Sequence, residues 1–577
     1  MGRWTVRDLV LASGERVRVA VAAVALGFGP LLLLVASVAV AQSGETASVN
    51  TVSALVEAVE RGGVVTIAPG VYDLDQTLVL RGHVELQALE AGTVSLNLRA
   101  APLGISIEPA AEVRLVRLEL AYDADAPGDV MWVHDAALEL VDVDLAFALA
   151  GPSDDPERPF GVGAGLVLTG SAEARVEGGG IGRHEGYGVE LHGAAVLHAE
   201  DLLVIRNGAG LHVDADARLT LVGGEVLGHM GSALHVRGRA HAELIGTLVE
   251  DNGTAGLGEG LDVDAVRVGD EAQATFDGVT FAFNPRYALS VHGRARVHSR
   301  DSVYESNGGA DPASELLISA VWVGDTGRLT MERDRLVDNP GGAIELAGRA
   351  NVELGFVSIE RTGTWAHTYV VDGAQLRVVG GRFAANEGAF YVGGAADARL
   401  DEVEVVGGAG EGVIADGEAQ VSIRGGSIVG HASFGLYLAG AAQAWVDDTV
   451  VVGNRSGLVA SDASWLRVEG AEVRDNEHSG VAFLDASSGE VRGSRVSGNP
   501  WSGVVAAGQA FVEVIGSVLD GNAGRGAWFE DDSSGIFRDN TVRGSAVGVE
   551  VAEGASPRLG DNVFEDVGEE VVMHGER

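Results

Sequence analysis

Residues 188–213 read GVELHGAAVLHAEDLLVIRNGAGLHV, and the spacing of apolar residues in this stretch indicates the fold. Two copies of one pattern, a small residue followed by apolar-x-apolar, stand at its ends: Gly188-Val-Glu-Leu and Gly210-Leu-His-Val. Alternation with a period of two residues is typical of β-strands. The residues between the copies form further short alternating runs. No amphipathic helix therefore fits between the strands.

The same pattern recurs from about residue 100 to the C-terminus, mostly in steps of 21 to 25 residues, which predicts about twenty coils. Its small residues stand at positions 104, 130, 165, 188, 210, 233, 260, 288, 320, 343, 368, 389, 412, 435, 457, 480, 503, 526 and 548. Inward residues would stack from coil to coil, as at Leu211, Leu234, Leu261 and Leu289. Because a solenoid grows without a new core, we predict one all-β domain, a right-handed parallel β-helix.

Asparagines mark one turn of the predicted coil. An asparagine tolerates the left-handed backbone conformation and can hydrogen-bond to its copy in the next coil, so a ladder of them indicates a parallel β-helix. The ten residues are Asn207, Asn252, Asn284, Asn307, Asn339, Asn386, Asn454, Asn476, Asn499 and Asn522.

The N-terminal segment predicts export. Residues 19–41 are uncharged and mostly apolar, and they end in Ala39-Val40-Ala41, the small-x-small pattern that signal peptidase cleaves. The same run is long enough to cross a bilayer, so a retained anchor is the alternative for residues 1–41. In either case we expect a secreted, periplasmic or cell-surface protein that contacts a membrane only through this segment.

The ends of the predicted solenoid have their own signals. Residues 42–62 would form a linker and an amphipathic helix that covers the first coil, because an exposed sheet end invites aggregation. The β-helix itself would occupy residues 63–564, and residues 565–577 would form a C-terminal cap or tail.

The amino-acid composition excludes several classes of catalytic chemistry and of binding partner. The chain has 577 residues, a formal net charge of −43 and no cysteine, and every basic side chain other than histidine is arginine. The absence of lysine excludes Schiff-base chemistry and a lysine general base. An acidic body repels nucleic acid and anionic membrane surfaces, and it would suit Ca²⁺, cationic partners or neutral glycans. We expect a monomer with no nucleic-acid partner.

The segment Thr66-Ile-Ala-Pro-Gly-Val-Tyr72 and the coils after it resemble the pectin-lyase-like superfamily of right-handed parallel β-helix proteins. The resemblance covers almost everything from residue 51 onward and implies the fold. It implies function poorly, because the superfamily includes hydrolases, lyases, epimerases and adhesins. The Gly-His-Gly element of polygalacturonases is only approached, at Gly228-His229-Met230 and Gly430-His431-Ala432, and no known active site is carried over by motif.

The resemblance also implies where to look, since the strand after the loop-bearing turn often lines the substrate cleft in these enzymes. Side chains two and four positions after the small residue would point outward. Insertions at 150–164, 253–259 and 308–318 lengthen the turn before the same strands. The two outward rows of these coils contain Trp132, Glu190, His192, His212, Asp214, His235, Arg237, Asp262, Asp264, His292 and Trp322.

Three interpretations of this face stay open. In an enzyme, Asp214, Asp264, His192 and His235 would act as acid and base, and Arg237 would hold a uronate carboxylate or act as base. In a glycan-binding protein without chemistry, aromatic rings would stack on sugars, with polar contacts around them. In a structural or adhesive rod, the face would only be solvated. The residues assigned to substrate binding are Trp132, Glu190, His212, Asp262, His292 and Trp322.

No cofactor is predicted with certainty. The paired carboxylates Asp214 and Asp264 would suit Ca²⁺. His212, His235 and Asp262 have the composition of a transition-metal site, although cross-strand pairing explains such histidines more simply. The main prediction is an exported β-helix that contacts polysaccharide. The alternatives are a lyase, hydrolase or epimerase acting on acidic glycans, and a rod without chemistry.

Overall fold

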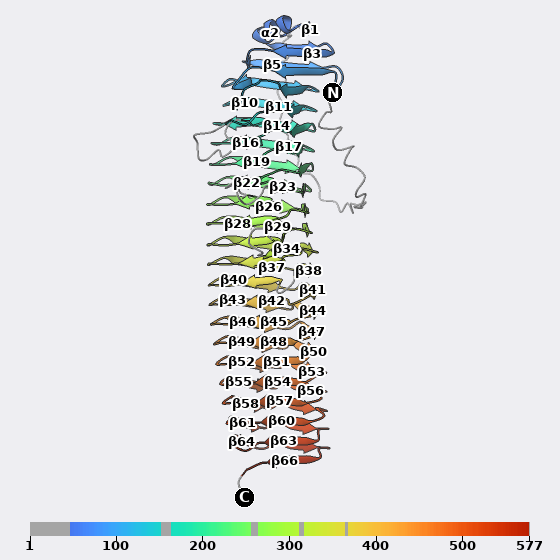
Figure 1. The fold of residues 1–577 in the computed structure, drawn as a ribbon, viewed down its shortest axis with the longest axis vertical. Helices are drawn as coiled ribbons and strands as arrows, with labels where there is room; N and C mark the ends of the chain where they lie inside the picture. Colours follow the sequence, from blue (N-terminus) through green and yellow to red (C-terminus); the bar gives the residue numbers. More distant parts are fainter. Residues whose placement is uncertain (1–46, 152–162, 255–262, 311–316, 364–366, 576–577) are drawn as a thin grey trace, which may run out of the picture. The chain divides into compact units, whose positions relative to one another are not determined.

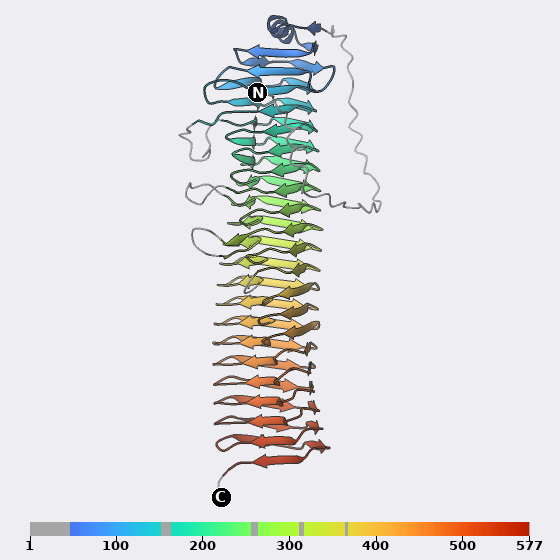
Figure 2. The same cartoon turned by 45° about the vertical axis from the view of Figure 1, so that its right-hand side comes forward.

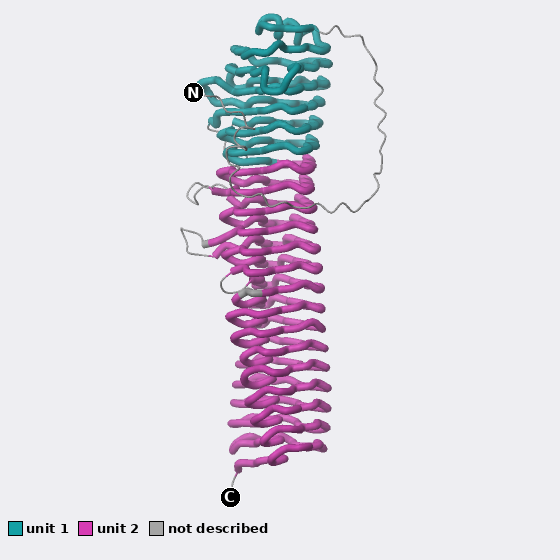
Figure 3. Tube along the Cα trace, turned by 90° about the vertical axis from the view of Figure 1, so that its right-hand side faces the viewer, with its two compact units in different colours: residues 1–212 teal, residues 213–577 magenta. Residues whose placement is uncertain are grey.

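The computed structural model describes residues 47–151, 163–254, 263–310, 317–363 and 367–575. The chain divides into two compact units, residues 1–212 and 213–577, coloured teal and magenta in Figure 3. Both units are parallel β-solenoids, with about 21 turns in total, and the predicted fold class is confirmed. Residues 1–41 lie outside the described residues. Within the described ranges, no helix has the length and hydropathy needed to cross a membrane.

A turn contributes one short strand to each of three parallel sheets, A, B and C. In unit 2, for example, β52 (Trp465–Glu469) belongs to sheet A, β53 (Glu472–Arg474) to sheet B and β54 (Ser479–Phe483) to sheet C. Each pairs in parallel with the equivalent strand of the next turn. Strands of one sheet therefore follow one another along each unit (Figure 1, Figure 2).

The core lies inside the turns and is built by alternation along each strand. In β52, Leu466 and Val468 point inward and are fully buried, whereas Arg467 between them points outward. Burying one such leucine side chain stabilises the fold by about 2 kcal/mol. The gain recurs because the next turn presents its own inward residues at the same positions.

Sheet C positions the candidate site, because its strands follow the asparagine-bearing turn. Up to the end of unit 1 its strands are β4 (Leu78–Leu80), β7 (Leu103–Ile107), β10 (Asp129–His134), β13 (Leu166–Thr169), β16 (Tyr187–Leu191) and β19 (Ala209–Val213). In unit 2 they are β22 (Leu234–Val236), β25 (Val266–Val268), β28 (Leu289–Val291), β33 (Val321–Val323), β36 (Ile344–Leu346), β39 (Thr368–Val370), β42 (Phe390–Val392), β45 (Val413–Ala415), β48 (Phe434–Leu438), β51 (Ser456–Ala460), β54, β57 (Ser502–Ala506), β60 (Arg525–Phe529), β63 (Val547–Val551) and β66 (Glu569–Met573).

The predicted asparagine ladder is confirmed in unit 2. Asn454 donates its backbone N–H and its Nδ2 to Oδ1 of Asn476, at 3.0 and 3.2 Å. Asn476 donates in the same way to Asn499, and Asn499 to Asn522, and all four residues are fully buried. An earlier run of the same kind consists of Asn252, Asn284, Asn307 and Asn339. The side chain of Asn386 lies outside the described side chains.

The predicted N-terminal helix is also present. Helix α2 (Val52–Arg61) begins at Thr51, whose Oγ1 accepts a hydrogen bond from the N–H of Ala54 at 3.2 Å. Its apolar side buries Leu55 and Val59, and the helix contacts β2 (Gly63–Ile67). At the other end, β66 continues sheet C to Met573, past the predicted boundary at residue 564.

Two predicted strand registers are wrong. Leu234 pairs with Val266, so the small residue of that coil is Ala265 rather than Gly260, and Leu261 lies outside the described residues. The residues at 260–263 and 265–268 both fit the small-apolar-x-apolar pattern, and the length of the insertion decides between them. In the coil at 368, Thr368 was expected to be the small residue before the strand, which would turn Val370 outward. Instead Ile344 pairs with Thr368, so Val370 points inward and is fully buried.

Candidate functional site

The outward residue at the middle of each sheet-C strand forms a continuous row in unit 2, which we call the outward ladder. The strand registers fix its members one by one, with one residue from each turn. In chain order they are His235, Arg267, Ser290, Trp322, Glu345, Tyr369, Tyr391, Ile414, Tyr437, Val459, Ala482, Val505, Trp528 and Glu550.

Unit 1 has an equivalent row, and four predicted site residues lie on it or beside it. Trp132 in β10 is 39% exposed, and its Nε1 donates to Oδ2 of Asp129 at 2.8 Å. Glu190 is almost fully buried in β16 and lies 3.0 Å from Nε2 of His192. The rings of His192 and His212 are 5.6 Å apart. Of these residues, Trp132 is the most accessible to a ligand.

The predicted catalytic residues of unit 2 have separate partners. Asp214 follows β19, and its Oδ1 lies 3.6 Å from Nε of Arg237. Asp264 accepts a hydrogen bond from Oγ of Ser290 at 2.7 Å and lies 4.0 Å from Nε of Arg286. These contacts place Asp214 beside Arg237 and Asp264 beside Ser290 and Arg286.

The register correction changes two of these assignments. Asp262 lies outside the described residues, so the predicted metal site with His212 and His235 is not tested. Asp264 precedes β25 instead of standing four positions after a small residue, and Arg267 holds the ladder position of that turn.

Aromatic residues dominate the next part of the outward ladder. The Trp322 ring lies over Gly324, the residue that follows its strand, where a Cβ would clash with Cη2 of the ring. The ring also contacts His292, with centroids 4.5 Å apart. Tyr391 lies over Gly393 in the same way, since a Cβ there would be 2.7 Å from the Tyr391 ring. Both glycines thus leave room for a ring to lie along the strand.

Three further rings extend this aromatic section. The rings of Tyr369 and Tyr391 are 4.9 Å apart at an angle of 33°, and those of Phe434 and Tyr437 are stacked at 5.2 Å. Apart from Phe434, these rings are tyrosines or, at Trp322, an indole, so each of them has a hydroxyl or an N–H at its edge for hydrogen bonds. Rings with polar edges on a pleated face suit sugars, which have apolar faces and polar rims.

Glu345 is the single acidic member of the aromatic section. Burial raises the pKa of its carboxyl above the ordinary value. Burial also raises the pKa of Tyr287, with the charges of Glu345 and Asp264 adding to the effect. The pKa of Tyr369 is raised by burial first, and then by Tyr391 and Glu345. The carboxylate of Glu345 therefore lies close enough to both hydroxyls to act on them electrostatically.

Farther along the ladder the side chains become small and apolar. Val459, Ala482 and Val505 point outward yet are at most 8% exposed, because Tyr437 and Trp528 pack against them with other neighbours. The guanidinium of Arg525 lies 4.2 Å from the centroid of the Trp528 ring. This part offers no ionisable group until Glu550 and is less suited to orienting a polar ligand.

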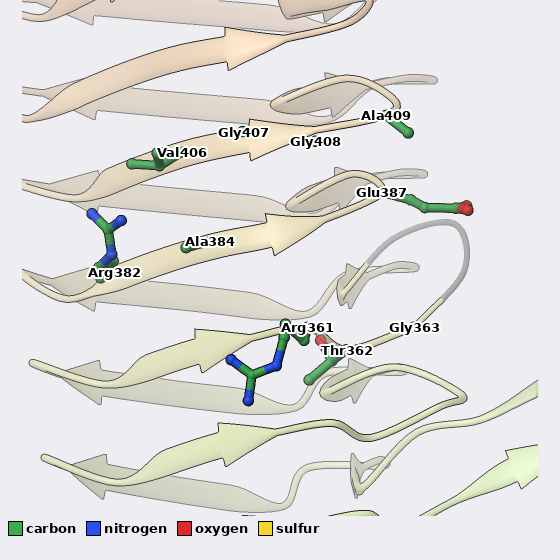
Figure 4. Close-up of a pocket in the computed structure, with 10 residues that line it drawn as sticks. All are labelled: Arg361, Thr362, Gly363, Arg382, Ala384, Glu387, Val406, Gly407, Gly408 and Ala409. Carbon is green, nitrogen blue, oxygen red and sulfur yellow. The ribbon is translucent and has the colours of Figure 1, made fainter.

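A concave site in unit 2 lies elsewhere, along sheet B (Figure 4). It has a volume of about 670 Å³, and Arg361 and Arg382 line it from neighbouring turns. Arg361 donates to both carboxylate oxygens of Asp338, at 2.8 and 2.9 Å, and Arg382 to Glu404 at 3.0 Å. Both guanidinium groups are thus already neutralised, and no predicted site residue lies here.

Comparisons with known proteins agree with the fold. A family model described as the right handed beta helix region matches residues 370–518 and 435–575. The matched part of the chain has the fold of a right-handed β-helix. None of the curated proteins compared with the chain matches.

Several solved structures resemble this β-helix only distantly. The periplasmic alginate epimerase AlgG is 10% identical over 61% of this chain and 76% of its own, with a TM-score of 0.30. The PL6 alginate lyase AlyGC is 9% identical over 92% of this chain and 100% of its own, also with a TM-score of 0.30. The GH87 α-1,3-glucanase of Streptomyces thermodiastaticus is 15% identical over 71% and 66%, with a TM-score of 0.31.

Sequence reasoning missed the middle of the site. It identified Trp322 and His292 but assigned no site residue beyond Trp322, and the wrong register at residue 368 hid Tyr369. The recurrence of Tyr391 and Tyr437 at the position two after the small residue was the available signal. The glycines beneath Trp322 and Tyr391 carried no signal of their own, because their role depends on the direction in which each ring folds.

Proposed function

We propose that the β-helix binds a polysaccharide along the outward ladder of unit 2, at Trp322, Tyr369, Tyr391 and Tyr437. The observation that carries the proposal is the pair of rings laid over Gly324 and Gly393, which makes flat aromatic surfaces three turns apart on one rigid sheet. Neighbouring strands of a sheet are about 4.8 Å apart, so the rings of Tyr369 and Tyr391, on adjacent turns, are spaced on the length scale of a sugar unit. Binding on strands needs little reorganisation.

A glycan array followed by calorimetric titration tests this proposal. Trp322→Ala and Tyr391→Ala should each weaken binding about tenfold, since a well-placed aromatic contact contributes roughly 1–2 kcal/mol. Phe356→Ala is the control, because Phe356 is 67% exposed in the turn before β38 (Ser358–Glu360), away from sheet C. Equal effects of all three substitutions, or no glycan bound at all, would refute the proposal.

The same titrations separate binding from catalysis. Polysaccharides that bind should be incubated with the protein, with and without Ca²⁺, and assayed for new reducing or unsaturated ends. We expect binding without turnover, because no known active-site motif of the β-helix enzymes is present in the sequence. Turnover that is lost in an Asp214→Ala, Arg237→Ala double variant would instead support the enzyme interpretation.

We also propose that the protein is exported. The apolar run before Ala39-Val40-Ala41 supports cleavage near Ala41. N-terminal sequencing of the protein recovered outside the cytoplasm should find a chain that begins just after this point. A protein outside the cytoplasm that still begins at Met1 would support the anchor instead.

A further inference from the structure

The turns of Trp322, Glu345 and Tyr369 place one carboxylate between two aromatic side chains. Trp322 pairs in register with Glu345, and Glu345 with Tyr369, so the three stand on consecutive strands of the outward ladder.

A third ring approaches from the turn before β28. The centroid of Tyr287 is 6.4 Å from that of Trp322, at an angle of 47°. The charge of Glu345 contributes to the raised pKa values of both Tyr287 and Tyr369, which puts its carboxylate near two phenol groups. Three rings and one carboxylate thus lie on, or beside, three consecutive strands of sheet C.

Glu345 has no cationic partner of its own in the described part of the chain. Its carboxylate makes no ion pair or hydrogen bond there, although it is more than half buried. Arg286, the residue before Tyr287 in the turn that leads to β28, has its Nε 4.0 Å from Oδ1 of Asp264. A partly buried carboxylate without a cation is unfavourable, and a cationic ligand would remove the penalty.

We propose that this cluster, Tyr287, Trp322, Glu345 and Tyr369, binds an ammonium group carried by the glycan, so that the ligand is an amino-sugar polymer with free amines. The inference rests on the proposed function and names its ligand class. Aromatic faces attract cations through the ring quadrupole, and a carboxylate beside them adds a direct ion pair. The net charge of −43 favours a cationic polymer over a polyuronate.

The test compares two polymers that differ only at the nitrogen. A β-linked glucosamine oligosaccharide and its fully N-acetylated counterpart, equal in length, are titrated into the full chain at a mildly acidic pH where the amines are charged. A polyuronate oligosaccharide serves as the anionic comparison. The free-amine ligand should bind at least about tenfold more tightly than the other two.

Glu345→Gln is the decisive variant, because it removes the charge while keeping the size of the side chain. It should abolish the preference for the free amine and leave binding of the N-acetylated ligand unchanged. Glu353→Gln is the matched control, since Glu353 is exposed on β37 (Asn351–Gly355) of sheet A in the same turn. Circular dichroism should show that both variants fold.

The outcomes distinguish this inference from the proposed function. A glycan that binds with no preference for free amines, or a preference that survives Glu345→Gln, would overturn the inference and leave the proposed function standing. Binding of the polyuronate alone would do the same. If no glycan binds at all, both fail together.

Discussion

Replacing Asp334 with asparagine should stabilise the protein above neutral pH. Asp334 lies in the turn between β34 (Arg328–Glu332) and β35 (Arg335–Val337) and is 1% exposed. Its Oδ1 accepts a hydrogen bond from the backbone N–H of Ser302 at 2.7 Å, whereas its Oδ2 has no hydrogen-bond partner among the described residues. Burial raises the pKa of this carboxyl from 3.8 to about 7.

The sign and the size of the effect follow from this shift. Since the pKa in the folded state exceeds that in the unfolded state, the contribution of the group to stability is complete below about pH 3.8 and is lost as the pH rises toward 7. A shift of about three units at 1.36 kcal/mol each corresponds to roughly 4 kcal/mol. Asparagine does not ionise, so the variant should escape this loss.

The protein itself shows that asparagine fits this turn. Asn540 occupies the equivalent position several turns later, where its Oδ1 accepts from the N–H of Ser517 at 2.9 Å. Its Nδ2 donates to the carbonyl of Val514, also at 2.9 Å. An asparagine at 334 can make the corresponding bonds to Ser302 and Ser299.

Urea denaturation of the variant and the wild type, at a series of pH values from 4 to 8.5, measures the difference directly. The stability difference should grow in favour of Asp334→Asn by about 4 kcal/mol across this range. The reciprocal variant, Asn540→Asp, should become less stable over the same range. A difference that does not change with pH, or that favours the wild type more as the pH rises, would refute the reasoning.

Three further substitutions have expected outcomes. Gly324→Ala should push the Trp322 ring off the strand and weaken glycan binding about fivefold, measured by titration. Gly269→Ala is the control, because nothing lies within 4 Å of a Cβ there. An equal effect of the two substitutions would contradict the role of the ring. Asn476→Ala should lower the free energy of unfolding by about 2 kcal/mol, because it leaves the buried backbone N–H of Asn454 without its acceptor. A urea midpoint equal to that of the wild type would argue against the ladder. Burial lowers the pKa of His367 from 6.5 to about 3, so stability should fall as the pH drops from 6.5 toward 3, and His367→Gln should flatten this fall in thermal melts. A variant as acid-sensitive as the wild type would exclude His367 as the cause.

The fold could be predicted because each turn repeats the same kinds of side chain at the same positions. Alternating apolar residues and Asn454, Asn476 and Asn499 report on inward stacking and on one turn directly. The register at residue 260 could not be predicted, because two adjacent segments fit the strand pattern equally well. Near residue 368 the register was one residue off, because the position that usually holds a small residue holds His367. This histidine is buried, and its Nδ1 lies 2.8 Å from Oγ1 of Thr362.

The site was predictable only in its location. Trp322 and His292 were found because they stand in an outward row beside an insertion. The partnering of Asp214 with Arg237 and of Asp264 with Ser290 depends on rotamers, which no pattern of residue types encodes. For the same reason the buried carboxyl of Asp334 gave no signal, since aspartate is an ordinary residue in turns.

The asparagine ladder also bears on how such a chain can change its length. Asn476 bonds to Asn499, 23 residues later, in the same way that Asn499 bonds to Asn522. Removing residues 477–499 would bring Asn476 into the place of Asn499 and restore the same bonds with Asn522. Recombination between mispaired repeats of a gene would therefore delete or duplicate whole turns without creating a misfit at the junction. The number of aromatic rings on the outward ladder could then change from one generation to the next, while each turn keeps its own structure.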